Sequence, residues 1–237
     1  MSESVHFATL ARREPLAREV VAYRFHLAAG EEGLWWRGGQ FLSLACGVDA
    51  GEPVLRSYSI ASRPGAGDLL LVVKLLADGF GSNWFRRLEV GTRIRFTGPF
   101  GFFYLDPRHN GDLVFAATGT GIAPMLPMID ELLDRGDGAA IHLFWGLRDE
   151  EDRFWSAELE ERVARSRGRL TVRLCLSRPR HGLGQRLVAP LLALAPALQR
   201  PVFYLCGNGA MIRELKGALV AQGVDRRRQI RSEAFCD

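Results

Sequence analysis

The chain has 237 residues, of which 47% are hydrophobic and 24% are charged, and its formal net charge is +4. This composition is that of a packed globular protein, and the length allows one large domain or two modest ones. Apolar residues come in short bursts, and no run approaches the roughly 20 apolar residues of a membrane span. The sequence also begins without the pattern of a secretory signal. We therefore expect a soluble, cytoplasmic protein.

The four cysteines are far apart in the sequence, at Cys46, Cys175, Cys206 and Cys236. No close pair suggests a zinc or iron–sulfur site, and a chain of this size builds its core without disulfides. We therefore expect no bound metal, and any one-electron acceptor must be a separate molecule.

The basic excess is small and dispersed, which argues against a nucleic-acid-binding face. Its short clusters are Arg12–Arg13, Arg86–Arg87 and Arg226–Arg228. Each cluster fits a solvated surface, or alternatively a docking surface for an acidic partner.

The first hundred residues have the pattern of β-strands. Segments rich in β-branched and aromatic residues alternate with Gly- and Pro-rich turns, and one helical stretch interrupts them near residues 82–88. The expected strands are residues 7–10, 20–27, 40–44, 54–60, 69–76 and 93–97. Short strands at this spacing predict an all-β barrel or sandwich.

From residue 112 onward, strands alternate with helices. The expected strands are residues 113–117, 141–145, 170–176, 202–205 and 229–232, and the expected helices are residues 124–133, 155–166 and 209–222. This alternation predicts a parallel sheet covered on both faces. A turn-rich stretch lies between the two patterns, so we predict a β-barrel domain over residues 1–107 and an α/β domain over residues 108–237.

A Gly-rich loop, T-G-T-G-I-A-P at residues 118–124, follows the first strand of the α/β half and opens a helix. Gly119 and Gly121 allow a tight turn, and the N–H groups at the helix start suit a pyrophosphate. The loop lacks the third glycine of the usual G-x-G-x-x-G pattern. Taken alone, it also fits a plain strand-to-helix connection.

Two motifs in the β half indicate the same class of ligand. R-S-Y-S occupies residues 56–59, and G-F-G-S at residues 79–82 opens the helical stretch. Arg56 offers a planar fork of donors for a phosphate, and the helix start at Ser82 offers a second anion site. Tyr58 has a flat ring suited to a planar cofactor. Each residue alone also fits a structural role in a barrel, but together with the downstream loop they indicate a dinucleotide cofactor.

With these motifs in this order, the chain resembles the ferredoxin–NADP reductase superfamily from Gly39 to its end. Residues 144–149 and the C-G-N sequence at residues 206–208 also look like segments of that family. The resemblance implies an oxidoreductase with non-covalent FAD that moves hydride and electrons between NADP(H) and a one-electron carrier. That carrier would be a separate acidic ferredoxin or flavodoxin. We further expect a monomer that binds neither nucleic acid nor membrane.

The resemblance also implies roles for individual residues. The FAD would be held by Arg56, Ser57, Tyr58, Ser59, Val73, Lys74, Gly79, Gly81, Ser82 and Phe235. The nicotinamide dinucleotide would be held by Thr118, Gly119, Thr120, Gly121, Pro124, Ser177, Arg178, Arg186, Cys206, Gly207 and Asn208. The catalytic residues would be Ser59, Cys206 and Glu233, around the point of hydride transfer, and Phe235, which would cover the flavin.

Two further features bear on this resemblance. Plant-type members end at a tyrosine, whereas this chain has Phe235 followed by Cys236 and Asp237, as in bacterial members with short extensions. Arg178, helped by Arg180 or Arg186, lies where NADP-specific relatives hold the 2′-phosphate, which favours NADP(H). Two alternatives stay open: an NADH-dependent reductase component of a multicomponent oxygenase, and an FAD-binding electron-transfer subunit without turnover of its own.

Overall fold

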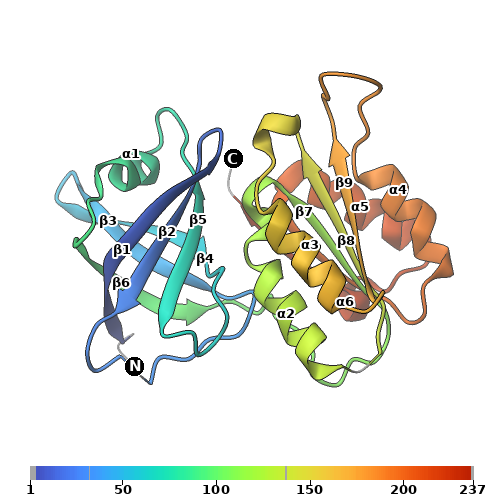
Figure 1. Cartoon of the computed structure of the whole chain (residues 1–237), viewed down its shortest axis with the longest axis horizontal. Helices are drawn as coiled ribbons and strands as arrows, with labels where there is room; N and C mark the ends of the chain where they lie inside the picture. Colours follow the sequence, from blue (N-terminus) through green and yellow to red (C-terminus); the bar gives the residue numbers. More distant parts are fainter. Residues whose placement is uncertain (1–3, 32, 137, 236–237) are drawn as a thin grey trace. The chain divides into compact units, whose positions relative to one another are not determined.

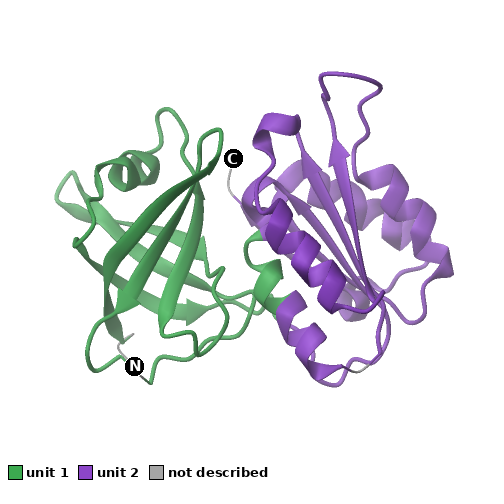
Figure 2. Ribbon diagram, in the orientation of Figure 1, with its two compact units in different colours: residues 1–104, 123–128 green, residues 105–122, 129–237 purple. Residues whose placement is uncertain are grey.

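A computed structural model of the chain describes residues 4–31, 33–136 and 138–235. It divides into two compact units, Met1–Tyr104 with Ala123–Met128, and Leu105–Ile122 with Ile129–Asp237 (Figure 2). The first unit is built on an antiparallel sheet and the second on a parallel sheet with helices (Figure 1). The expected fold class, a β domain followed by an α/β domain, is therefore confirmed. The functional boundary between residues 107 and 108 stays a prediction.

The first unit is a six-stranded antiparallel sheet. Its strands are β1 (Val5–Ala17), β2 (Val20–Leu27), β3 (Phe41–Asp49), β4 (Glu52–Ser59), β5 (Asp68–Lys74) and β6 (Arg93–Phe100). They lie in the order β4-β3-β6-β1-β2-β5. Strands β4 and β5 are the two edges of this sheet, and an isolated bridge between Ile60 and Leu71 joins the end of β4 to β5. The sheet thus curls toward a closed barrel.

Alternate residues of these strands fill the barrel core, as the period of two in a β-strand requires. Leu10, Phe25 and Leu71 are fully buried or nearly so. The helix α1 (Phe80–Arg87) lies between β5 and β6 in the chain and packs Phe85 on Tyr23, with 4.6 Å between the ring centroids. This contact fixes the helix on the barrel.

The second unit is a five-stranded parallel sheet in the order β11-β10-β7-β8-β9. Its strands are β7 (Leu113–Thr118), β8 (Ile141–Leu147), β9 (Leu170–Leu176), β10 (Val202–Asn208) and β11 (Ile230–Phe235). Its helices are α2 (Met125–Arg135), α3 (Ser156–Arg165), α4 (Val188–Leu194), α5 (Gly209–Ala221) and α6 (Arg226–Gln229). Helices α2 and α3 cover one face of the sheet, and α4 and α5 cover the other (Figure 1). Because both faces are covered, β7 and β10 are buried along almost their whole length.

Some elements differ from the sequence expectation. Helix α4 was not predicted; it tolerates Pro190 because that residue lies in the first turn, where its missing N–H has no intrahelical acceptor to lose. The one-turn helix α6 was also not predicted, and Asp225 caps it by accepting from the N–H groups of Arg227 and Arg228. Three short 3-10 turns complete the described elements: Gly119–Ile122, Glu150–Asp152 and Ala195–Ala197.

No helix in the described ranges is both long enough and apolar enough to cross a lipid bilayer. The cytoplasmic location stays a prediction.

Candidate functional site

The two motifs of the first unit meet at one place. R-S-Y-S forms the end of β4, and G-F-G-S forms the start of α1. A Cβ atom added to Gly81 would clash with Tyr58 Oη and would come within 3.4 Å of Arg56 Cγ. Only glycine therefore fits at residue 81, and the structure brings Arg56, Tyr58 and Gly81 together as the sequence predicted.

The start of α1 is suited to an anion. Gly79 occupies its N-cap position, and no side chain caps the first turn. The Ser82 hydroxyl instead accepts from the Leu76 N–H at 2.9 Å, which fixes the turn before the helix. The first N–H groups of a helix have no intrahelical acceptor, and the helix dipole makes this end positive. A phosphate can accept hydrogen bonds from these N–H groups, and its negative charge is stabilised by the positive end of the helix dipole.

Arg56 supplies the positive charge beside this helix start. Its side chain is exposed and donates to the Leu55 carbonyl at 2.8 Å. Among the residues that the structure describes, no carboxylate pairs with it. The guanidinium is thus available to a diphosphate. An uncapped helix start, a free guanidinium and a glycine without room for a side chain fit the phosphate end of FAD.

Tyr58 lies half-buried beside Arg56. Its ring packs edge-on against Phe85, with 4.8 Å between centroids. Burial raises the pKa of the Tyr58 hydroxyl well above its usual range, and burial also raises the pKa of the nearby Cys46 thiol to about 11. Both groups are therefore neutral at physiological pH, so Arg56 is not neutralised by either of them.

Four more of the predicted FAD residues lie on the two edge strands of the barrel sheet, whereas Phe235 lies on β11 of the second unit. Ser57 is exposed and Ser59 half-buried on β4, while Val73 is buried and Lys74 exposed at the end of β5. In the described chain, β5 contacts the end of β4 through the Ile60–Leu71 bridge, and no described strand pairs with Val73 and Lys74 on that side. Main-chain groups at such an edge are open to a ligand.

In the second unit, the Gly-rich loop passes directly over the end of β10. A Cβ atom on Gly121 would lie 2.5 Å from the carbonyl oxygen of Cys206, and one on Gly207 would clash with Thr118 Oγ1. Gly119 has a φ of +53° and Gly207 a φ of +115°, both in the region that favours glycine. The predicted loop residues Thr118, Gly119, Thr120 and Gly121 therefore lie beside the predicted C-G-N segment, and Pro124 leads into α2.

Asn208 holds this junction together. Its N–H donates to Thr118 Oγ1 at 2.8 Å, and its side-chain oxygen accepts from the N–H groups of Ala210 and Met211 at the start of α5. The residue is therefore a helix cap as well as a predicted contact of the nicotinamide.

Cys206 and Glu233 are partners in the register of β10 and β11, and Asn208 is the partner of Phe235. Cys206 is fully buried, and burial, reinforced by the Glu233 carboxylate, raises its pKa well above the usual range. The thiol is thus protonated at neutral pH and is not a nucleophile. Ser59 belongs to the other unit, so its approach to this pair stays a prediction. Cys236 and Asp237 lie outside the described residues.

The three predicted phosphate-binding arginines differ in their partners. Arg186 forms an ion pair with Glu214 at 2.6 Å, and Arg180 pairs with Glu151. Arg178 follows Ser177 at the end of β9, where its N–H donates to the Arg148 carbonyl at 2.7 Å. Its side chain is exposed and forms no ion pair within the described part of the chain. Arg178 is therefore the arginine of this loop that is free to bind a 2′-phosphate.

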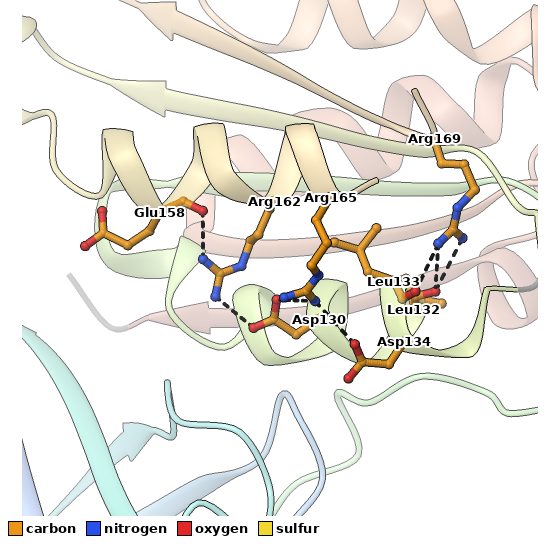
Figure 3. Close-up of polar contacts among 8 residues, drawn as sticks. All are labelled: Asp130, Leu132, Leu133, Asp134, Glu158, Arg162, Arg165 and Arg169. Atoms are coloured by element: carbon orange, nitrogen blue, oxygen red, sulfur yellow. Dashed lines mark hydrogen bonds and ion pairs between the residues drawn. The ribbon is translucent and has the colours of Figure 1, made fainter. Parts of the chain in front are cut away.

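Helix α2, which follows the loop, is fixed to α3 by a charge cluster centred on the buried Asp130 (Figure 3). The Asp130 carboxylate accepts from Arg162 at 2.7 Å and from Arg165 at 3.2 Å. Arg169 donates to the carbonyls of Leu132 and Leu133 near the end of the same helix. Sequence reasoning missed this cluster, because neither period nor motif identifies side chains that pair across two helices.

Comparison with known proteins agrees with this geometry. Residues 7–104 match the family model of the oxidoreductase FAD-binding domain, and residues 115–216 match that of the oxidoreductase NAD-binding domain. Ferredoxin–NADP reductase B of Sorangium cellulosum is 36% identical over 215 residues, which cover 86% of this chain and 87% of the relative. The chain belongs to the ferredoxin–NADP reductase superfamily.

Other members show the breadth of this superfamily. The ferredoxin–NAD(P)(+) reductase component of naphthalene 1,2-dioxygenase/salicylate 5-hydroxylase systems of Ralstonia sp is 32% identical over 174 residues. That match covers 72% of this chain and 53% of the relative, so the chain spans about half the relative's length. The solved structure of the cytochrome P450 reductase GcoB of Amycolatopsis has a TM-score of 0.87 and 25% identity, over 99% of this chain and 71% of that one. The family prediction is confirmed: the chain is a flavin-dependent oxidoreductase with FAD-binding and NAD-binding domains.

Proposed function

We propose that this chain is a ferredoxin or flavodoxin reductase that transfers electrons between NADP(H) and a separate one-electron carrier. The observation that carries this proposal is the exposed Arg178 side chain just after β9, which forms no ion pair in the described residues, in a chain with FAD-binding and NAD-binding domains. A guanidinium suits the 2′-phosphate that distinguishes NADPH from NADH.

The residues of the first unit bind and orient the cofactor. FAD, when bound, accepts a hydride from the nicotinamide and releases its electrons one at a time. Arg56 and the N–H groups at Gly81 and Ser82 neutralise its diphosphate. Tyr58, held by Phe85, presents a flat face to the flavin ring. The edge of β4 and β5, with Ser59, Val73 and Lys74, provides hydrogen-bonding groups for the rim of that ring.

The residues of the second unit bind the nicotinamide dinucleotide. The loop at residues 118–121 receives the pyrophosphate, and Arg178 receives the 2′-phosphate. Cys206 contributes a small neutral surface, since its thiol stays protonated. Glu233 holds the nicotinamide amide, and Phe235 covers the flavin until the nicotinamide displaces it. These roles, and those in the first unit, are proposals for the individual residues.

A basic surface on the first unit supports an acidic carrier. Arg13 Nη1 donates to the carbonyls of Arg86 and Leu88 at 3.4 and 3.3 Å, so β1 reaches the end of α1. Arg13 therefore lies beside Arg86–Arg87, and these three exposed arginines form what we call the basic surface, whereas Arg12 is paired with Glu14. Such a surface attracts a partner of opposite charge and speeds its docking.

The second candidate function is that of an NADH-dependent reductase component of an oxygenase, which feeds a separate ferredoxin. The similarity to the Ralstonia reductase component favours it. Both functions use the same FAD site, and they differ in the nucleotide and in the carrier's own partner.

One experiment separates these functions. The purified protein, saturated with FAD, is mixed without oxygen with NADPH or NADH, and the loss of flavin absorbance is timed. The reduced protein is then mixed with the ferredoxins and the flavodoxin of the same organism. We expect faster reduction by NADPH and rapid transfer to at least one carrier. Faster reduction by NADH contradicts the proposal and favours the oxygenase component, while reduction without transfer to any carrier indicates an electron-transfer subunit. Light scattering tests the expected monomer.

A further inference from the structure

A tryptophan outside the motifs holds the dinucleotide loop. Trp145 lies on β8, the strand next to β7, and is 1% exposed. Its indole Nε1–H donates to the carbonyl oxygen of Gly119 at 3.0 Å. Gly119 is the first residue of the turn that follows β7. The side chain of one strand therefore reaches the loop that leaves its neighbour.

The Trp145 ring cannot easily move away from this position. Phe154, itself buried, packs edge-on against it with 4.9 Å between centroids, and Trp155 packs in turn on Phe154 at 5.2 Å. Trp145 is also the register partner of Ala117, two residues before Gly119. Strand pairing and ring packing thus fix the donor before any ligand arrives.

This hydrogen bond sets the direction of the next N–H group. A trans peptide is planar, so the carbonyl of Gly119 and the N–H of Thr120 point in opposite directions. Because the carbonyl faces the indole, the Thr120 N–H points away from it. Thr120 belongs to the Gly-rich loop at residues 118–121, which is the proposed site of the pyrophosphate.

Gly119 by itself does not secure this orientation. It has a φ of +53°, and a Cβ atom placed on it would meet nothing within 4 Å. The residue is therefore a glycine because of its backbone angle and not because of close packing, and glycine visits several conformations readily. The hydrogen bond from Trp145 adds a constraint from outside the 3-10 turn that begins at Gly119.

We propose that Trp145 is a positioning residue that orients the Gly119–Thr120 peptide so that the Thr120 N–H faces the pyrophosphate of the nicotinamide dinucleotide. The inference rests on the proposed function, because it assigns a new residue to the same nucleotide site. Since NADPH and NADH share the pyrophosphate, the loss of this hydrogen bond weakens both to the same extent. Loss of Arg178, in contrast, weakens NADPH alone.

The test replaces Trp145 with Phe in the FAD-loaded protein and titrates it with NADP⁺ and with NAD⁺. Loss of one neutral hydrogen bond corresponds to an increase of about fivefold in the dissociation constant, and we expect this increase for both nucleotides. In turnover, KM for NADPH and NADH rises while kcat and the flavin absorbance spectrum stay the same. Trp155→Phe is the matched control, because it removes the same atoms from a ring that packs on Phe154 and makes no described hydrogen bond to the loop.

A second variant excludes a packing defect. Incorporation of 3-benzothienylalanine at position 145 replaces the indole N–H by sulfur and keeps the ring's shape, so the same rise in both dissociation constants is expected. Unchanged constants in this variant, or a rise for NADP⁺ alone, overturn the role of Trp145. If the unsubstituted protein binds neither nucleotide, the proposed function itself fails, which is a different result.

Discussion

Asp130 and Arg162 form an ion pair of 2.7 Å in which the aspartate side chain is only 3% exposed (Figure 3). Removing one partner of a buried pair leaves the other charge without compensation. Without Asp130, the Arg162 guanidinium would keep its bond from Nη1 to the Glu158 carbonyl but would have no anionic partner among the described residues, and its Nε is already buried without a hydrogen-bond partner there. We expect Asp130→Ala to lower the free energy of unfolding by about 3 kcal/mol, measured by urea denaturation.

The neighbouring residue provides the control for this prediction. Glu131 pairs with Arg135 on the same helix, but its side chain is 39% exposed. Exposed pairs contribute about 1 kcal/mol or less, so Glu131→Ala is expected to change stability little. Equal losses in the two variants would mean that burial of Asp130 does not matter.

Gly81→Ala tests the FAD site. The added methyl group would clash with Tyr58 Oη, and overpacking of this kind costs about 1–3 kcal/mol. We expect the apoprotein to bind FAD about tenfold more weakly or worse, as measured by the quenching of flavin fluorescence on titration.

Gly217→Ala is the matched control for Gly81→Ala. Gly217 lies within α5, and a Cβ atom there meets nothing within 4 Å. Alanine is favoured over glycine in a helix by about 1 kcal/mol, so this variant should be more stable and should retain FAD normally. Undiminished FAD affinity in Gly81→Ala would remove the start of α1 from the site.

Arg178→Ala tests the choice of nucleotide. The loss of a charge-assisted contact with the 2′-phosphate raises KM for NADPH by about tenfold or more, and KM for NADH should hardly change. Arg180→Ala is the control, because Arg180 is held by Glu151 and by the N–H contact of its own backbone with Glu150. An equal rise for both nucleotides in Arg178→Ala would show that Arg178 does not recognise the 2′-phosphate.

Arg87→Glu tests the basic surface. Reversal of an exposed charge slows the docking of an acidic carrier at low salt, by about threefold, and the difference should shrink as salt is added. Reduction of the flavin by NADPH should be unaffected. Arg226→Glu makes the same charge change on α6 of the second unit, and a similar slowing there would mean that net charge, not the basic surface, guides the carrier.

The raised pKa of the Cys46 thiol predicts that the free energy of unfolding decreases at alkaline pH. Burial raises its pKa from 9.0 to about 11, so the folded protein holds this proton more tightly than the unfolded chain. Its contribution to stability is therefore complete below pH 9 and is lost as the pH rises toward 11. We expect the free energy of unfolding to fall by about 2 kcal/mol more in the unsubstituted protein than in Cys46→Ala between pH 8 and pH 11. Parallel pH profiles would contradict the raised pKa.

Motifs with fixed spacing predicted the parts of the site that depend on the backbone. Gly81 and Gly207 lie where another chain segment comes too close for a side chain. Glycine at a fixed place in such motifs predicts this close approach from the sequence. The meeting of Arg56 and Tyr58 with the start of α1 followed for the same reason. The alternation of strands and helices likewise predicted the fold class, because the spacing of hydrophobic residues differs between strands and helices.

The features that the sequence did not predict depend on side chains that are distant along the chain. The bond from Trp145 to Gly119 and the pair of Asp130 with Arg162 both join separate elements. Arg186 looked as suitable as Arg178 for a phosphate, and only the fold shows that Glu214 already neutralises it. Such contacts are set by tertiary packing, which local patterns do not encode.

The loop between β9 and α4 is anchored close to the sheet at both of its ends. The Gln185 N–H donates to the Leu176 carbonyl at 2.7 Å, so the loop leaves and rejoins the sheet at nearly the same point. Between these anchors, the backbone N–H groups of Ser177 and Arg178 donate to the carbonyls of Leu147 and Arg148, whereas the Arg178 side chain is exposed. On the proposed role of Arg178, replacing residues 177–184 by those of an NADH-using relative should shift the preference from NADPH to NADH, because the backbone bonds that hold the loop do not depend on its side chains.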